Sequence, residues 1–177
     1  MSSWRVMARG LALVVWAFLA WPDHSYGRSR AHTSSQVLGG SHVYVLLGLS
    51  NNSPRPSEFG SRMARRGIPT TIRNYGEWPA LAQEAIQQYR SGRLRSIMIV
   101  GHSLGGSAAA EMAAELGRDG IPVQLVVMLD PVGGSQVSSN VRRSVNFRPI
   151  GGEDHFSVIA AHEQDMSNYV LGAVLVP

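Results

Sequence analysis

Ser96-Ile-Met-Ile-Val-Gly-His-Ser-Leu-Gly-Gly106 is the stretch that decides the fold of this chain. It opens with four consecutive apolar residues, 97–100, which predict a short strand buried on both faces of a parallel sheet. Gly101 and Gly105 flank Ser103 in the spacing G-x-S-x-G, and a Cβ at either position would crowd a tight turn. The Ala-rich segment 107–116 follows and predicts a helix packed closely on the sheet, with Gly117 as the residue that ends it. The stretch therefore predicts a strand, a sharp turn that carries a serine, and a helix.

The same alternation continues on both sides of this turn. Apolar runs predict strands at 42–47, 68–73, 97–100, 123–129 and 144–147. Helical spacing predicts helices at 57–66, 78–90 and 107–116, and a terminal helix between 156 and 175. Strands that alternate with helices are typical of an α/β domain with a parallel sheet. We expect about five mostly parallel strands, and no insertion is long enough to form a cap over them.

Composition excludes several classes of function. The chain has 177 residues, of which 44% are hydrophobic and 16% charged, so one compact domain is expected. All sixteen basic residues are arginines, and they are scattered without interleaved aromatic residues, so no nucleic-acid partner is expected. The absence of cysteine rules out disulfides, a thiol nucleophile and zinc-thiolate sites.

The N-terminus has the pattern of a secretory leader. Arg5 and Arg9 precede an apolar run at 11–21 that is too short for a comfortable membrane span, and Ser25-Tyr26-Gly27 offers a cleavage site. We therefore expect a signal peptide at 1–27, a polar linker at 28–41 and the folded domain at 42–177, in a secreted or periplasmic protein. An uncleaved leader would anchor the chain in the membrane, and a wrongly assigned start codon is the other alternative.

A serine hydroxyl becomes a useful nucleophile only when a histidine accepts its proton and a carboxylate holds that histidine. Asp130 directly follows an apolar strand, where its charge would otherwise be unfavourable, although a turn residue before Pro131 is the simpler interpretation. His155 lies in a Gly-rich loop after the last strand, from which it could reach Ser103. These three residues are the predicted catalytic set.

Other residues remain as alternatives. Glu153 and Asp154 are rivals for the acid, and His162 is a rival for the base, although its expected place in the terminal helix puts it about two turns beyond His155. His42 begins the first strand, at the wrong end of the sheet. His102 adjoins the serine, and we expect its side chain to point elsewhere and to serve a structural role.

Three segments together resemble a known family: Gly-His-Ser-Leu-Gly-Gly at 101–106, Leu-Asp-Pro at 129–131 and Asp-His-Phe-Ser at 154–157. They are similar to small α/β-hydrolases of the lipase and thioesterase-domain type, and the likeness covers roughly 42–172. It implies a nucleophile elbow at Ser103, the chain order Ser, Asp, His, and an acid directly after the strand that follows the nucleophile helix. It also implies an oxyanion hole made by the backbone N–H groups of Leu49 and Leu104.

The resemblance implies a serine esterase, lipase or thioesterase that forms an acyl-enzyme on Ser103 and needs no metal or organic cofactor. Its substrate would be a small-molecule or lipid-like ester or thioester. An acyltransferase that uses the same three residues, and a catalytically silent hydrolase-fold binding protein, are the alternatives.

Overall fold

The computed structural model describes residues 39–51 and 54–175, and its centre is a single parallel sheet. Its strands are β1 (Ser41–Leu47), β2 (Thr70–Asn74), β3 (Ser96–His102), β4 (Leu125–Leu129) and β5 (Ser144–Phe147). They lie side by side in the order β2-β1-β3-β4-β5, and every neighbouring pair is parallel. The predicted α/β-hydrolase fold with a minimal five-stranded sheet is confirmed.

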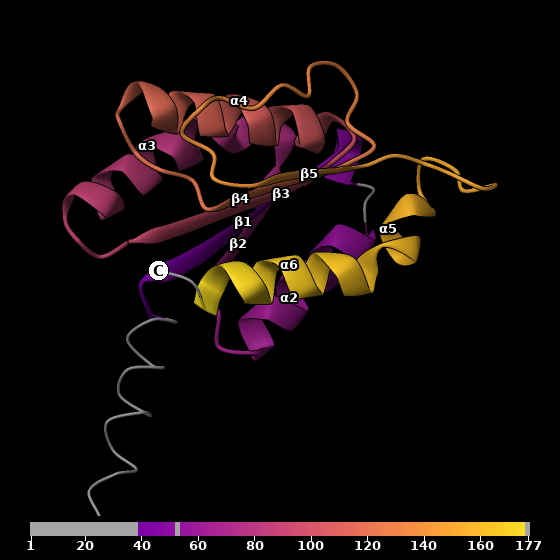
Figure 1. The fold of residues 1–177 in the computed structure, drawn as a ribbon, viewed down its shortest axis with the longest axis horizontal. Helices are drawn as coiled ribbons and strands as arrows, with labels where there is room; N and C mark the ends of the chain where they lie inside the picture. The colour runs from indigo at the N-terminus through magenta and orange to yellow at the C-terminus, as the bar shows by residue number, and fades with distance from the viewer. Residues whose placement is uncertain (1–38, 52–53, 176–177) are drawn as a thin grey trace, which may run out of the picture.

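Helices cover both faces of the sheet. They are α2 (Pro54–Arg65), α3 (Trp78–Arg90), α4 (Leu104–Arg118), α5 (Val158–Ala161) and α6 (Glu163–Leu175), with short 3₁₀ turns η1 (Leu49–Asn51) and η2 (Tyr75–Glu77). In Figure 1, α3 and α4 lie together on one face of the sheet, and α2, α5 and α6 lie on the other. The sheet is therefore enclosed between two helical layers, as a parallel sheet requires.

The strands contribute alternate residues to the two faces. On β1, Tyr44 and Leu46 belong to the apolar cluster under α3 and α4, whereas Val43 and Val45 belong to the cluster under α2 and α6. All four are fully buried, because successive side chains of a strand point to opposite faces. This explains why these strands appear in the sequence as continuous apolar runs.

Helix α4 ends later than predicted, and Gly117 does not end it. The helix continues to Arg118, and Gly120, with φ of +71°, takes the left-handed position after it. The N–H of Ile121 then donates to the Leu116 carbonyl, which completes a Schellman turn. Gly117 is small for another reason: a Cβ there would lie 2.7 Å from Oδ1 of Asn140, which packs against this turn of the helix.

The C-terminal segment also differs from the prediction. Instead of one terminal helix, α5 stops at Ala161 and α6 starts at Glu163, with His162 at the break between them. The His162 ring stacks on Phe147 of β5, with 4.2 Å between ring centroids. The break between the two helices therefore coincides with a contact to the sheet.

Residues 1–38 lie outside the described part, so the predicted leader and most of the linker are not described. Strand β1 begins at Ser41, one residue before the predicted strand. Among the described residues, no helix combines the length and apolarity that a membrane crossing would need.

Candidate active site

Backbone strain gathers at one edge of the sheet. Within the described residues, three residues other than glycine have positive φ: Asn51 at 58°, Ser103 at 59° and Asp130 at 38°. They follow β1, β3 and β4, whose carboxyl ends meet at the same edge. Strained residues of this kind persist where function needs a precise geometry, so they indicate a functional site at this edge of the sheet.

The topology of the sheet also favours a site at the carboxyl edge, at the position between β1 and β3. After β1 the chain continues to β2 on one side, and it later returns to β3 on the other side. Ligands of open parallel sheets bind in the crevice outside the carboxyl ends at such a switch point. Ser103 directly follows β3 there.

Ser103 occupies a turn in which its neighbours must be small. A Cβ on Gly101 would overlap the carbonyl of Gly105, and one on Gly105 would overlap the carbonyl oxygen of Leu46. The turn brings the start of α4 into contact with the end of β1. Ser103 precedes α4 but its hydroxyl does not cap the helix, although serine commonly does so at this position. The hydroxyl is therefore not used to satisfy the helix end.

The side chains of Asp130 and His155 are hydrogen-bonded, although the two residues lie 25 positions apart in the chain. Nδ1 of His155 donates to Oδ2 of Asp130 over 2.7 Å, and the aspartate side chain is only 19% exposed. A proton on Nδ1 leaves Nε2 as the basic nitrogen of the ring. The other carboxylate oxygen, Oδ1, lies 3.4 Å from Nη1 of Arg148, a contact that the sequence did not suggest.

His102 contacts the loop of His155, a neighbour that the sequence did not suggest. Its Nε2 donates to the backbone carbonyl of His155 over 2.8 Å, and the two ring centroids are 4.6 Å apart. Burial lowers the pKa of His102, which favours the neutral ring as a donor to this carbonyl. His102 therefore has a structural role, and the segment that it supports is the loop that carries the candidate base, His155. In the sequence, the one feature that could have indicated this contact was a histidine at the polar end of an apolar strand.

The alternative acids and the alternative base are engaged elsewhere. Asp154 accepts from the backbone N–H groups of Phe156 and Ser157 at 2.8 and 2.7 Å, and these bonds lower its pKa. Glu153 accepts from the N–H of Ile150 at 3.2 Å. His162 lies 3.7 Å from carboxylate oxygens of Glu153 and Asp165 rather than beside Asp130.

The two residues expected to supply oxyanion donors lie at the ends of adjacent strands. Leu104 is the first residue of α4, so its N–H has no acceptor within the helix. Leu49 begins η1, and Gly48 separates it from β1. The Asn74 side chain supports this loop by donating to the Gly48 carbonyl and to Oδ1 of Asn51 at 3.3 and 2.9 Å. The carbonyl of Ser103 itself accepts from the N–H of Val132 at 3.1 Å, which ties the turn to the loop after β4.

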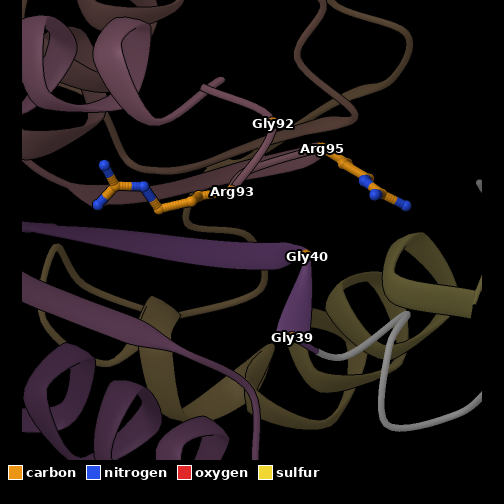
Figure 2. A pocket seen from close by; sticks show the side chains of 5 residues that line it. All are labelled: Gly39, Gly40, Gly92, Arg93 and Arg95. Atoms are coloured by element: carbon orange, nitrogen blue, oxygen red, sulfur yellow. The ribbon is translucent and has the colours of Figure 1, made fainter. Parts of the chain in front are cut away.

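A hollow elsewhere on the surface is unrelated to this edge. Glycines and two arginines line it: Gly39, Gly40, Gly92, Arg93 and Arg95. These residues come just before β1 and β3, so they lie at the amino ends of the strands, opposite Ser103. Figure 2 shows the side chains of Arg93 and Arg95 extending away from each other, so they do not converge on a common point.

The described residues also contain no group of three or more His, Cys, Asp and Glu side chains arranged to hold a metal ion. The candidate site consists of a serine, a histidine, an aspartate and backbone N–H groups.

Comparison with known proteins places this geometry in a family. A family model of the thioesterase domain matches residues 28–148, which is more than half of the chain. The chain belongs to the thioesterase domain family. The α/β-hydrolase resemblance is thereby confirmed, and family membership supports a hydrolase of small-molecule esters or thioesters. No curated protein matches the sequence.

The match to the thioesterase domain includes Ser103 and Asp130 but ends before His155. The candidate base therefore rests on the bond to Asp130 rather than on the family match.

Proposed function

We propose that this thioesterase-family protein is a serine hydrolase that cleaves carboxylic ester or thioester bonds through an acyl-enzyme on Ser103. The observation that carries the proposal is the 2.7 Å bond between His155 and Asp130, on loops at the same sheet edge as the strained Ser103. Strain, a serine hydroxyl that does not cap its helix, and a carboxylate-bound histidine together support nucleophilic catalysis.

In the first step, Oγ of Ser103 attacks the carbonyl carbon while Nε2 of His155 accepts the hydroxyl proton. Asp130 holds Nδ1 of His155 and stabilises the imidazolium that forms. The N–H groups of Leu104 and Leu49 stabilise the oxyanion, and the amino end of α4 adds a favourable dipole. When the carbon–sulfur or carbon–oxygen bond breaks, the leaving thiol or alcohol takes the proton from His155.

In the second step, water attacks the acyl-enzyme and gives its proton to His155. The carbon–oxygen bond to Ser103 breaks, the serine recovers a proton from His155, and the carboxylic acid leaves. An alcohol acceptor in place of water would give an acyltransferase with the same first step.

A fluorophosphonate probe that reacts with activated serines tests the proposal. The protein should be labelled, and Ser103→Ala should lose both labelling and ester hydrolysis, by roughly 10⁵ to 10⁶ in kcat. Its melting temperature should change little, because the hydroxyl does not cap α4. Turnover by a pure Ser103→Ala protein would contradict Ser103 as the nucleophile. A wild type that is neither labelled nor active would contradict the proposal and leave a silent binding protein.

We also propose that residues 1–27 direct export and are then removed. The charged start, the short apolar run and the small residues at 25–27 support this. N-terminal sequencing of exported protein should give Arg28 as the first residue, and an intact Met1 in membrane fractions would indicate an anchor instead.

A further inference from the structure

The carboxylate of Asp130 has a basic partner on each of its oxygens. Oδ2 accepts from Nδ1 of His155 over 2.7 Å, and Oδ1 lies 3.4 Å from Nη1 of Arg148. In the part of the chain that the structure describes, no third basic side chain is paired with this carboxylate. The proposed acyl-enzyme mechanism uses the His155 bond alone, so Arg148 is a cation beside the site that takes part in none of its steps.

The pairing of β4 with β5 brings Arg148 to this carboxylate. Leu129 and Phe147 are partners in the parallel register, and each is the last residue of its strand. The N–H of Asp130 then donates to the Phe147 carbonyl over 2.7 Å. This carbonyl belongs to the peptide that joins Phe147 to Arg148, so the backbone of the arginine is held beside the aspartate.

The contact with Arg148 limits how the Asp130 side chain can turn. Asp130 already has a strained backbone, with φ of +38°, and its side chain is 19% exposed. A charged hydrogen bond to Oδ1 restricts rotation of the carboxylate and keeps Oδ2 directed at Nδ1 of His155. The arginine side chain is 52% exposed, so solvent and salt screen its charge and it adds little to stability. Its effect should therefore fall on the catalytic pair rather than on the fold.

The charge of Arg148 also bears on the protonation of His155. A cation on one oxygen of Asp130 repels a second cation, the imidazolium, on the other oxygen, and the neutral ring is the form that can accept the serine proton. Two more ionisable side chains face His155: the His102 ring, 4.6 Å away between centroids, and the Asp154 carboxylate, which interacts with it electrostatically. A substitution at Arg148 leaves both of these groups in the chain, so it isolates the contribution of the arginine.

We propose that Arg148 is a positioning residue of the serine hydrolase, which orients the Asp130 carboxylate toward His155 and opposes protonation of His155 by solvent. The inference rests on the proposed function and adds to it a residue that acts through the acid and does not touch the substrate.

The pH dependence of kcat/KM tests the role of the charge. p-Nitrophenyl acetate is a suitable substrate because it is uncharged, so Arg148 cannot act by attracting it. In Arg148→Met the acidic limb of the profile should move to higher pH by roughly 0.3 to 0.5 of a unit, since the imidazolium is no longer repelled. Arg148→Lys keeps the charge, and lysine can replace a contact made through one nitrogen, so its limb should match the wild type. An unmoved limb in Arg148→Met, or an equal shift in Arg148→Lys, would overturn the inference.

The alkaline plateau of the same profiles tests the orientation of the carboxylate. There kcat should fall several-fold in Arg148→Met with little change in KM, and Arg148→Lys should keep most of the wild-type value. A higher KM with kcat unchanged would make Arg148 a substrate-binding residue and overturn the inference.

Arg90→Met is the matched control. Arg90 is 65% exposed and is paired with Asp119, where α3 and α4 end near the amino edge of the sheet. Its removal also takes away an exposed ion pair, but both the limb and the plateau should equal those of the wild type. Melting temperatures should be similar in all these variants, because exposed ion pairs contribute little to stability.

A titration that needs no turnover separates two failures. The protonation of the His155 ring is followed by NMR in Ser103→Ala, with and without Arg148→Met, and its midpoint should be higher without the arginine by the same fraction of a unit. If the wild type is active but the midpoints are equal, the inference about Arg148 fails and the proposed hydrolase survives. If the wild type is neither labelled by a fluorophosphonate nor active, the proposed function fails, and the catalytic role of Arg148 fails with it whatever the titration shows.

Discussion

At the scale of single residues, His155 and His162 differ in the group that each can reach. His155 has its Nδ1 on Asp130, whereas His162 stacks on Phe147 and faces Glu153 and Asp165. A general base must lie within hydrogen-bond reach of the proton that it takes, and a carboxylate partner fixes its tautomer. The carboxylate partner points to His155 as the base, and the contacts of His162 point to a role in stability.

We therefore expect His155→Ala to lower kcat by several orders of magnitude with little change in KM. His162→Ala is the matched control, and it should lower the melting temperature through the lost Phe147 contact while its kcat per active site stays near the wild-type value. Steady-state kinetics, normalised to folded protein, measure both. A larger loss of kcat in His162→Ala than in His155→Ala would rule out the assignment of the base.

At the scale of elements, the unit of β3, the turn and α4 depends on close approach of backbones. Helix α4 begins so near the end of β1 that a Cβ on Gly105 has no room beside the Leu46 carbonyl. Gly106 is similarly confined, because a Cβ there would lie 2.8 Å from Cβ of Pro131. The same contacts that keep these residues small set the position of Ser103.

Gly105→Ala should therefore destabilise the protein by roughly 3 kcal/mol or more, since the clash is with backbone and not with a movable side chain. Gly172→Ala is the control. Gly172 lies in α6 with open space around its Cβ position, so alanine there should stabilise the helix by at most about 1 kcal/mol. Urea unfolding measures both, and equal effects of the two substitutions would contradict this account.

At the scale of the whole molecule, stability should depend on pH through one buried histidine, His102, and one partly buried histidine, His42. Burial is the main cause that lowers the pKa of both His42 and His102 in the folded protein. In the unfolded chain these histidines bind protons near the ordinary pKa of 6.5, whereas burial in the folded protein disfavours their protonation at that pH. Their contribution to stability is therefore fully present above this pH and is lost as the pH falls below it.

The melting temperature should consequently fall between pH 7 and pH 5, and His42→Gln should make the fall shallower. Glutamine can keep a hydrogen bond to Oγ1 of Thr71, which His42 meets at 2.8 Å, without taking up a proton. Differential scanning calorimetry across this range checks both statements. A fall of the same steepness in His42→Gln would show that His42 does not contribute.

Local patterns were sufficient to predict much of this protein. Buried parallel strands appear as apolar runs and amphipathic helices have a regular spacing, so the five-stranded α/β fold and the bounds of α3 and β5 could be predicted without knowledge of distant contacts. The glycines around Ser103 indicated a tight turn for the same reason, since steric crowding within a few residues is a local property.

Contacts between distant segments decided the rest. Asn140 packs against Gly117 in the last turn of α4, and Phe147 against His162 accompanies the break between the last helices. The bonds of His102 to the His155 carbonyl and of Arg148 to Asp130 join residues far apart in the chain. Periodicity and turn chemistry carry no information about such pairs, because only the packed sheet brings the loops at its carboxyl edge together. The sequence by itself therefore determined the fold and the serine turn, and the tertiary structure decided which histidine is hydrogen-bonded to the aspartate.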